Sequence, residues 1–359
     1  MRNMQDNPIN KLFEKRVSWL ADSGPEDDIA ISSRIRLARN IREIPFPSNA
    51  GTDNMESSTA AVLLAVEKTK CFRKFYEIDM AKLNPLDRQV LLERRLISRE
   101  FFAKKQNTAL VMTDDEVCSI MINEEDHLRM QAMLSGLRLG EVWKIIDRID
   151  DRLSSELPYA FDDNLGYLTS CPTNVGTGIR ASVMLHLPGL VLGEQINAVI
   201  QAVNKLGLAV RGIFGEGTES LGNLFQISNQ STLGETEIQI IERLEAVIRQ
   251  IINHEKNSRQ KLLQNRREFL MNHVGRSYGM LRHSYIIPSE DTLNSLSALR
   301  LGVDMGMFSS VDIHTVNELF VIVQPGHLQK YAGKDLDTSE RDIFRATVIR
   351  ERLKSSEKK

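Results

Sequence analysis

The chain has 359 residues, of which 42% are hydrophobic and 26% are charged, the usual balance for a globular protein with a buried core. Its net charge of −2 excludes an overall field that would attract nucleic acid or a membrane surface. Three cysteines without paired spacing argue against a disulfide scaffold or a zinc site, and the absence of a signal-like or membrane-spanning apolar run completes the expectation of a cytoplasmic protein.

The first half of the chain predicts strands joined by short turns, with helices between groups of strands. Alternation over 29–37 predicts a strand with Ser32, Arg34 and Arg36 on one face and apolar residues on the other. The other elements expected in this half are helices over 58–69, up to 99 and over 141–157, and a hairpin over 108–123.

In the second half, the last predicted strand ends at about residue 228. The elements expected there are a strand pair at 166–169 and 179–187, a helix ending at Gly207, and strands 208–212 and 224–228 around a glycine-rich loop. A long amphipathic helix should start near Thr232, with Glu235 completing a capping box. From about 257 the pattern is helical only.

These patterns predict an α+β fold, because strands paired by short turns do not alternate strictly with helices. We expect a short N-terminal extension (1–27), a catalytic domain with a mostly antiparallel sheet flanked by helices (28–258) and an all-helical C-terminal domain (259–359).

Arginines recur on the predicted strands, although the chain has no P-loop, no dinucleotide-binding glycine motif and no protein-kinase signature. They are Arg34, Arg36, Arg180 and Arg211. A guanidinium group binds phosphate oxygens through two hydrogen bonds and stays charged at any working pH, so converging arginines would suit a triphosphate. Spacing alone favours the alternative of separate solvated faces or pairs with acidic residues.

Three further features allow both a functional and a structural interpretation. The acidic run 124–126 ends an apolar strand, which is costly unless it meets cations or metal, but a solvated cluster is the simpler interpretation. Glu216 stands among glycines, where a carboxylate can approach a ligand closely or lie in a plain mobile loop. Cys171 has no histidine base placed for it, which favours an inert thiol over a nucleophile.

Four motifs in this order resemble those of the phosphagen (guanidino) kinase family: SSRIR, NEEDHLR, CPTNVGTGIRAS and RGIFGEGTES. The resemblance covers about residues 28–258 and outweighs the structural interpretations above. It implies the glutamine-synthetase-like catalytic fold of that family, with ATP and Mg²⁺ as cofactors. Within the family, the chain most resembles the bacterial protein arginine kinases.

The resemblance also implies roles for single residues. Those implied in nucleotide binding are Ser32, Arg34, Arg36, Arg95, His127, Arg129, Arg180, Ser182 and Arg211. Glu125 and Glu216 would hold the substrate guanidinium and accept its proton as the N–P bond forms, and Cys171 would contribute electrostatically. Arg95 and Met184 stand where many members have histidine, so the adenine contacts stay open. No side chain is assigned to the metal.

Two features favour arginine side chains in proteins over free arginine as the substrate. Only 31 residues precede the first motif, whereas free-arginine and creatine kinases carry a helical N-terminal domain that partly covers the small substrate. The helical C-terminal domain contains Arg341, Asp342 and Arg345, similar to a motif associated with phosphoarginine binding in protein arginine kinases. Arginines four residues apart share a helix face and suit one phosphate, although a solvated basic face is the alternative.

We therefore expect a kinase that transfers the γ-phosphoryl group of ATP to arginine side chains in proteins. The resemblance implies an activator protein, a Clp-type ATPase and a stress-gene repressor as partners, and a homodimer formed through the helical domain. Neither nucleic acid nor a membrane is an expected partner. The alternatives are a lidless free-arginine kinase and a phosphoarginine-binding adaptor, although an adaptor has no need of both Glu125 and Glu216.

Overall fold

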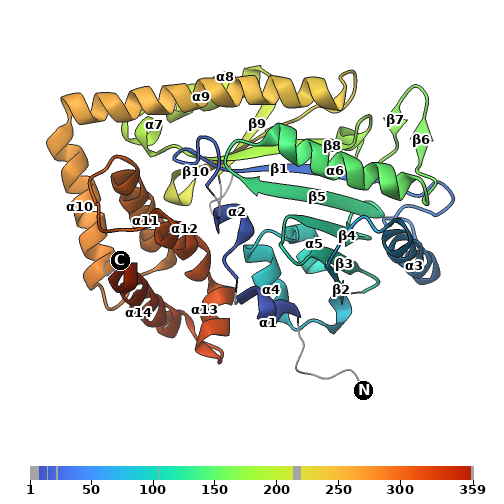
Figure 1. The fold of residues 1–359 in the computed structure, drawn as a ribbon, viewed down its shortest axis with the longest axis horizontal. Coiled ribbons are helices and arrows are strands. Elements are labelled where there is room, and N and C mark those ends of the chain that lie inside the picture. The colour runs from blue at the N-terminus through green and yellow to red at the C-terminus, as the bar shows by residue number, and fades with distance from the viewer. Residues whose placement is uncertain (1–7, 14, 22, 105, 213–219, 357–359) are drawn as a thin grey trace. The chain divides into compact units, whose positions relative to one another are not determined.

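The computed structural model describes residues 8–13, 15–21, 23–104, 106–212 and 220–356 (Figure 1). The chain forms two compact units. The first comprises Met1–Trp19, Ser32–Val183 and Ser228–Ala246, and the second comprises Leu20–Ile31, Met184–Ile227 and Val247–Lys359. No helix in the described ranges is both long and apolar enough to cross a bilayer.

Eight strands form one sheet in the order β2-β3-β4-β5-β1-β8-β10-β9. Their bounds are β1 (Ala30–Arg39), β2 (Phe75–Asp79), β3 (Ala109–Thr113), β4 (Cys118–Ile122), β5 (Leu128–Ser135), β8 (Ile179–His186), β9 (Leu208–Gly212) and β10 (Leu224–Asn229). The neighbours from β2 to β1 all pair antiparallel. The mostly antiparallel sheet is therefore confirmed.

The hairpin predicted over 108–123 is present as β3 and β4. The strand pair predicted between 166–169 and 179–187 is wrong. Strand β7 (Gly166–Tyr167) instead pairs with β6 (Phe161–Asp162), because the Asp162 carboxylate accepts the Asn164 and Leu165 N–H groups and closes a tight turn.

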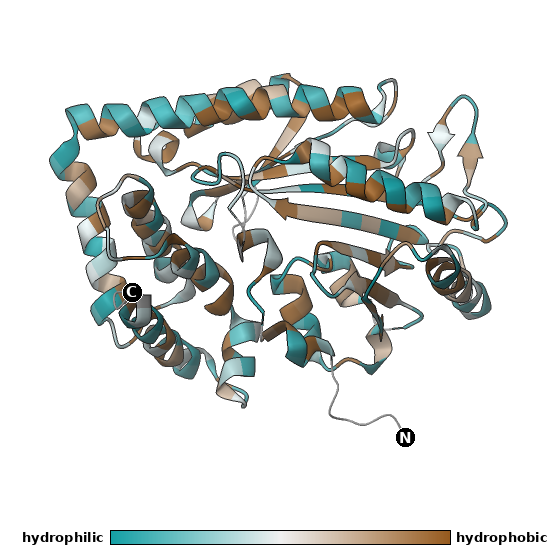
Figure 2. Ribbon diagram, in the orientation of Figure 1, coloured by the Kyte–Doolittle hydropathy of each residue, from teal (hydrophilic) through white to brown (hydrophobic). Residues whose placement is uncertain are grey.

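The helices of the first unit frame this sheet. They are α1 (Pro8–Phe13), α3 (Thr52–Thr69), α4 (Pro85–Glu93), α5 (Arg99–Ala103) and α6 (Leu139–Ser154), with α2 (Ser18–Ala21) at the border of the two units. Helix α6 carries a hydrophobic stripe, visible in Figure 2, whose members Val142, Ile146 and Leu153 are fully buried. This is the spacing of an amphipathic helix on a core, as expected over 141–157.

Helix α9 (Glu237–Asn265) starts later than predicted. The Thr232 hydroxyl donates to the Val175 carbonyl at 2.6 Å and so does not cap a helix. A reciprocal capping box forms four residues further on, where Thr236 N–H donates to Gln239 Oε1 at 2.9 Å and Gln239 N–H donates to the Thr236 hydroxyl at 3.3 Å. The predicted domain border at 258 falls inside this helix.

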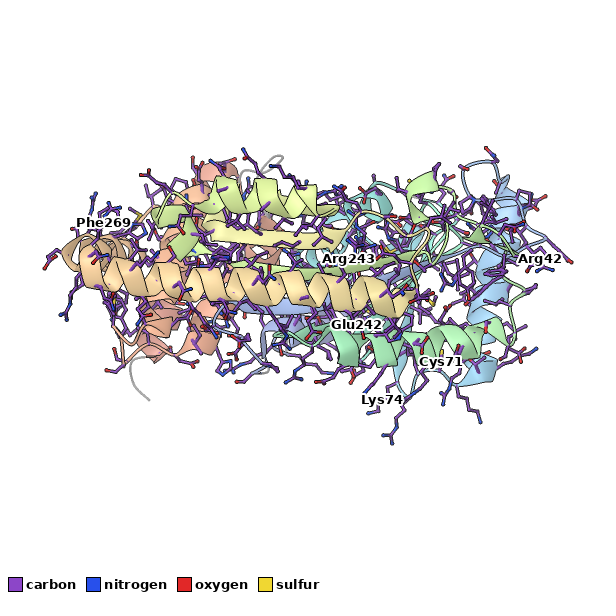
Figure 3. All side chains as sticks on the ribbon, turned by 90° about the horizontal axis from the view of Figure 1, so that it is seen from above. Arg42, Cys71, Lys74, Glu242, Arg243 and Phe269 are labelled. Carbon is purple, nitrogen blue, oxygen red and sulfur yellow. The ribbon has the colours of Figure 1, made fainter. Side chains whose placement is uncertain are left out.

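The second unit is mainly helical, with α7 (Pro188–Leu192) and α8 (Ile196–Lys205) before α9 and the other helices after it. The later helices are α10 (Arg267–His283), α11 (Ser289–Asp304), α12 (Ile313–Ile322), α13 (Pro325–Ala332) and α14 (Thr338–Ser356), and a short 3-10 turn η3 (Leu221–Asn223) comes before β10. Helix α11 lies at the centre of this unit, since it is buried along most of its length. Glu242 and Arg243 mark the first-unit part of α9, and Phe269 marks the start of α10 (Figure 3).

Candidate active site

In the central strands of the first unit, the half-exposed positions are occupied by arginines. In β1 every residue is buried except Arg34 and Arg36, and in β8 every residue is buried except Arg180. Strand β5 pairs with β1 so that Arg129 lies opposite Ala38, on the same face as Arg34 and Arg36, because directly opposed residues share a face. The sequence prediction that Ser32, Arg34 and Arg36 alternate with buried apolar residues is confirmed.

These arginines are close enough to repel one another. Burial and the charges of Arg129 and Arg180 lower the pKa of Arg34 to about 10. Burial and the charges of Arg34, Arg129 and Arg180 also lower the pKa of Arg36 well below its usual range. The unliganded face therefore carries an excess of positive charge at a cost in free energy, and an anion that pairs with these groups would remove that cost.

Arg95 joins the cluster from the turn between α4 and α5. Burial and the charges of Arg34 and Arg99 lower the pKa of Arg95 to about 9. Its backbone has a positive φ of 62°, uncommon for arginine, and its carbonyl accepts a hydrogen bond from Gln131 Nε2 at 2.8 Å. The guanidinium lies 5.1 Å from the ring centre of Trp19. The structure thus brings together five of the predicted nucleotide-binding arginines.

Two serines border the cluster. Ser32 is buried on the arginine face of β1, and the buried Ser182 hydroxyl donates to the Arg34 carbonyl at 3.4 Å. Ser182 therefore holds the backbone that carries an arginine.

The turn after β4 is held rigidly by buried side chains. Asn123 has a φ of 62°, and its side-chain amide donates to the carbonyls of Met55 and Asn107 while its carbonyl oxygen accepts from Ser58. The carboxylate of Glu124, which is fully buried, pairs with Arg129 and accepts from the Ser98 hydroxyl. This pairing offsets part of the charge excess.

The rigid turn leaves Glu125 exposed between two buried acids. Asp126 accepts from Asn40 Nδ2 and from the Ser170 N–H group, both at 2.7 Å, so its carboxylate is used inside the protein. Partial burial and the charges of Asp126 and Glu124 raise the pKa of Glu125, while Arg129 opposes the shift. A raised pKa makes this carboxylate a stronger base.

Cys171 is tied to the same turn through its neighbour Ser170. The Ser170 hydroxyl donates to the Glu125 carbonyl at 2.7 Å. The Cys171 sulfur lies 3.0 Å from the Thr173 hydroxyl and is partly exposed. The half-exposed thiol and the exposed carboxylate thus belong to two loops joined by hydrogen bonds.

His127 is fully buried, and both of its ring nitrogens are used within the protein. Its Nδ1 accepts the Ile41 N–H group at 3.1 Å, which leaves the proton on Nε2 to be donated to the Pro45 carbonyl at 3.1 Å. Burial lowers the pKa of His127. The neutral imidazole fixes the chain after β1, so a nucleotide contact of His127 stays a prediction.

A buried ion pair holds the C-terminal end of the loop that runs from Cys171 to Arg180. Arg39 pairs with Asp150 at 2.6 Å and donates to the Thr177 carbonyl at 2.9 Å. Gly178 has a φ of 65°, and a Cβ there would lie 2.6 Å from the Arg39 guanidinium, which explains the glycine. These groups position the loop from Cys171 to Arg180.

The remaining predicted residues lie elsewhere. Arg211 is the exposed penultimate residue of β9 in the second unit, and Glu216 lies outside the described residues. Arg341 of α14 donates to the Leu336 carbonyl at 2.9 Å and is partly exposed. Arg345 is fully buried and donates to the carbonyls of Val323 and Ile287, and it also pairs with Asp342.

Sequence reasoning did not identify Glu124, Lys104 or Arg39 as parts of the site. Lys104 donates to the Asn123 and Glu124 carbonyls across about 20 residues of chain, and Arg39 meets Asp150 across 111. No local pattern marks such pairs. Strand β5 was also not predicted, because most of its residues are buried and no alternation is left to reveal it. In the described part of the chain, no group of three or more His, Cys, Asp and Glu side chains is placed to hold a metal.

Two family models match the chain. Residues 55–258 match the C-terminal catalytic domain of ATP:guanido phosphotransferases, and residues 267–359 match the C-terminal domain of the protein-arginine kinase McsB. The chain is 48% identical over 335 residues to a protein-arginine kinase of Pelotomaculum thermopropionicum, covering 92% of this chain and 94% of that protein. It is 47% identical to a protein-arginine kinase of a Geobacillus species, covering 98% of each.

Solved structures show the same catalytic fold. A lombricine kinase superposes with a TM-score of 0.57 at 23% identity, over 64% of this chain and 67% of that chain. The duplicated taurocyamine kinase of Schistosoma mansoni superposes with a TM-score of 0.57 at 25% identity, over 65% of this chain and 34% of that one. The guanidino-kinase fold predicted from the four motifs is confirmed.

Proposed function

Since this chain belongs to the protein-arginine kinases, a family of phosphotransferases, we propose that it transfers the γ-phosphoryl group of ATP to the guanidinium of arginine side chains in proteins. One observation carries the proposal: five arginines, each of which repels at least one other of the five, converge in the unit that also presents an exposed glutamate with a raised pKa. An anion-binding face beside a base is what transfer to a nitrogen nucleophile requires.

The arginines bind and align the triphosphate. In phosphoryl transfer the protein mainly positions the groups and neutralises charge on the transferred oxygens. Fixed positive charge is supplied by Arg34, Arg36, Arg129, Arg180 and Arg95, and we assign the same task to Arg211. Mg²⁺ would be held chiefly by the phosphates and water, the usual mode of this ion in nucleotide sites, and would neutralise phosphate charge there.

The carboxylates act on the acceptor. An arginine substrate is charged, so its attacking nitrogen has no free lone pair until a proton leaves. Glu125 and Glu216 hold the guanidinium in line with the γ-phosphorus, and one of them takes the proton as the N–P bond forms and the bond to ADP breaks. Cys171 contributes electrostatically beside the substrate cation and forms no covalent bond.

Two alternatives remain distinct from this proposal. A free-arginine kinase would use the same carboxylates on a small substrate, and an adaptor would bind phosphoarginine without making it. The chain is 48% identical to a protein-arginine kinase along nearly its whole length, which supports phosphorylation of arginine in proteins over both alternatives.

We also propose how the product is used. The modified proteins pass to a Clp-type ATPase and its protease, and a stress-gene repressor is inactivated by the same modification. An activator protein regulates the kinase, which works as a homodimer in the cytoplasm. Arg341, Asp342 and Arg345 of the helical domain bind phosphoarginine.

The test is to incubate the protein with Mg-ATP and a mixed protein extract and to map acid-labile phosphate by mass spectrometry. Phosphoarginine on many proteins, absent with Glu216→Gln, is the expected result. Abundant phosphate on free arginine beside unmodified proteins would instead establish the free-arginine kinase.

A further inference from the structure

The start of the chain is built into the first unit beside the turn that carries Arg95. The segment up to Trp19 belongs to this unit and precedes residue 55, where the catalytic family model begins to match. In α1, Ile9 and Leu12 are buried in the hydrophobic core that also contains Leu96, the residue after Arg95. This packing brings the segment next to a predicted nucleotide-binding arginine.

Lys15 fixes the segment at two points. Its carbonyl accepts a hydrogen bond from Arg94 Nη2 at 3.3 Å, and its Nζ donates to Asp114 Oδ2 at 2.8 Å in the turn between β3 and β4. Arg94 is itself buried in an ion pair with Glu116, with 2.9 Å between Nε and Oε2. The segment is therefore joined to a buried ion pair as well as to the edge of the sheet.

Trp19 contacts both arginines of this turn. Its side chain is buried, and its indole N–H donates to the Arg94 carbonyl at 3.2 Å. The guanidinium carbon of Arg95 lies 5.1 Å from the centre of the Trp19 ring. A cation within about 6 Å of an aromatic ring centre is attracted by the negative face of the ring. One side chain thus holds the backbone of the turn and the guanidinium that follows it.

The Arg95 guanidinium needs such a restraint to stay in the cluster. The positive charges of Arg34 and Arg99 repel it, and burial adds to their effect in lowering its pKa to about 9. Repulsion favours conformations of this long side chain that move it away from Arg34. An aromatic ring opposes that movement without neutralising the charge, whereas a carboxylate in its place would compete with phosphate for the guanidinium.

We propose that Trp19 is a positioning residue for nucleotide binding, which holds the Arg95 guanidinium beside Arg34 so that both contact the phosphates of ATP. The inference rests on the proposed function, which makes ATP the ligand of the arginine cluster. It gives the segment before β1 a part in the nucleotide site, through contacts made within the first unit.

The experiment is a double-mutant cycle read out by calorimetry with Mg-ATP. Trp19→Leu removes the ring and keeps an apolar side chain, and Arg95→Met removes the charge and keeps the aliphatic stem. Both single variants, their combination and Trp19→Phe are compared with wild type. Trp143→Phe, at the half-buried tryptophan of α6, is the matched control, and melting temperatures are measured alongside.

We expect Trp19→Leu to weaken Mg-ATP binding about threefold to tenfold, the change that a cation–π contact supports. In the Arg95→Met background the same substitution should change the affinity less than about twofold, because the group on which Trp19 acts is gone. Trp19→Phe should retain more affinity than Trp19→Leu, since it keeps an aromatic face. Trp143→Phe should equal wild type.

A second measurement leaves Trp19 in place and so does not depend on the folding of its variants. The chain has two tryptophans, and Trp143→Phe leaves Trp19 as the single one. Saturating Mg-ATP should change the fluorescence of Trp19, because phosphate then pairs with the guanidinium beside the ring. Adding Arg95→Met should abolish this change.

Wild-type affinity in Trp19→Leu would overturn the inference. So would an equal loss with and without the Arg95 guanidinium, which is what a purely structural role of Trp19 predicts, or Trp19 fluorescence that does not respond to Mg-ATP. Phosphoarginine formation by the wild type is assayed in parallel. Its absence would refute the proposed function, whereas the binding comparisons test Trp19 alone, so the two failures are told apart.

Discussion

The arginine face is costly for the unliganded protein. Arg34 and Arg36 are desolvated by the sheet and repelled by Arg129 and Arg180, and the Nε atom of Arg36 is buried without a hydrogen-bond acceptor among the described residues. Groups whose pKa is shifted by burial and by neighbouring charges cluster at functional sites. Mutual repulsion thus indicates a binding site more directly than the presence of arginines on strands.

This cost gives a prediction for Arg36→Met, which keeps the aliphatic stem and removes the charge. The melting temperature of the unliganded variant should equal or exceed that of wild type. Its affinity for ATP should fall by about 1.5–3 kcal/mol, the value of a hydrogen bond to a charged group. Calorimetry with ATP and thermal unfolding measure the two quantities. A clear drop in melting temperature with unchanged ATP affinity would mean that Arg36 serves the fold and not the nucleotide.

The second residue-scale prediction concerns Glu125 and pH. Its raised pKa means that the carboxylate becomes protonated at a higher pH than an ordinary glutamate. Only the deprotonated form accepts a proton, so the rate of transfer should fall as the pH drops through this raised pKa and level off above it.

Glu125→Gln should remove this acidic limb and lower kcat by about a hundredfold or more, the usual size of a general-base contribution. ATP affinity should change little, because the carboxylate faces the acceptor. Asp163→Asn, a change at an exposed acid of the β6–β7 turn, serves as control. An unaltered pH–rate profile in the glutamine variant would exclude Glu125 as the base.

At the scale of single elements, the two arginines on α14 differ in their surroundings. Arg345 donates to the carbonyls of Val323 and Ile287 inside the unit, whereas Arg341 is half-exposed and donates to Leu336 and Thr338 at the start of its own helix. A double replacement would therefore mix a folding defect with a binding defect.

We predict that Arg345→Ala destabilises the protein by about 3 kcal/mol, because it leaves buried acceptors and the Asp342 carboxylate without their partner. Arg341→Ala should cost less than about 1 kcal/mol, as expected for an exposed charge. Thermal unfolding measures both. Calorimetry with free phosphoarginine on Arg341→Ala then tests binding in a folded protein, and wild-type affinity there would remove Arg341 from the proposed pocket.

Elements with a clear period could be predicted from the sequence, and elements buried on both faces could not. The alternation in β1 and the hydrophobic stripe of α6 can be recognised in the sequence because one face of each element is polar and the other is apolar. Strand β5 is buried on both faces and shows no such difference. The capping box of α9 was predicted four residues too early because Thr232 and Thr236 have the same local sequence pattern. The contacts of the Thr232 hydroxyl with the carbonyls of Thr173 and Val175 distinguish the two threonines.

At the scale of the whole chain, the four motifs identified the residues of the site but not their convergence. Spacing alone could not show that Arg34 is repelled by Arg180 and itself repels Arg95, since this depends on a turn and two strands that meet only in the fold. Equally, the hydrogen bond from Trp19 to the Arg94 carbonyl joins segments 75 residues apart. Such contacts follow from tertiary structure and leave no periodic trace.

The central claim is that the acceptor is an arginine in a protein and not the free amino acid. Its most direct test places free arginine and a folded protein with exposed arginines in one reaction with Mg-ATP, at equal concentrations of arginine groups. Phosphorus NMR after separation by size then measures N–P phosphate in each fraction, with Glu125→Gln as control. We expect the signal in the protein fraction, and a signal confined to free arginine would contradict a protein acceptor.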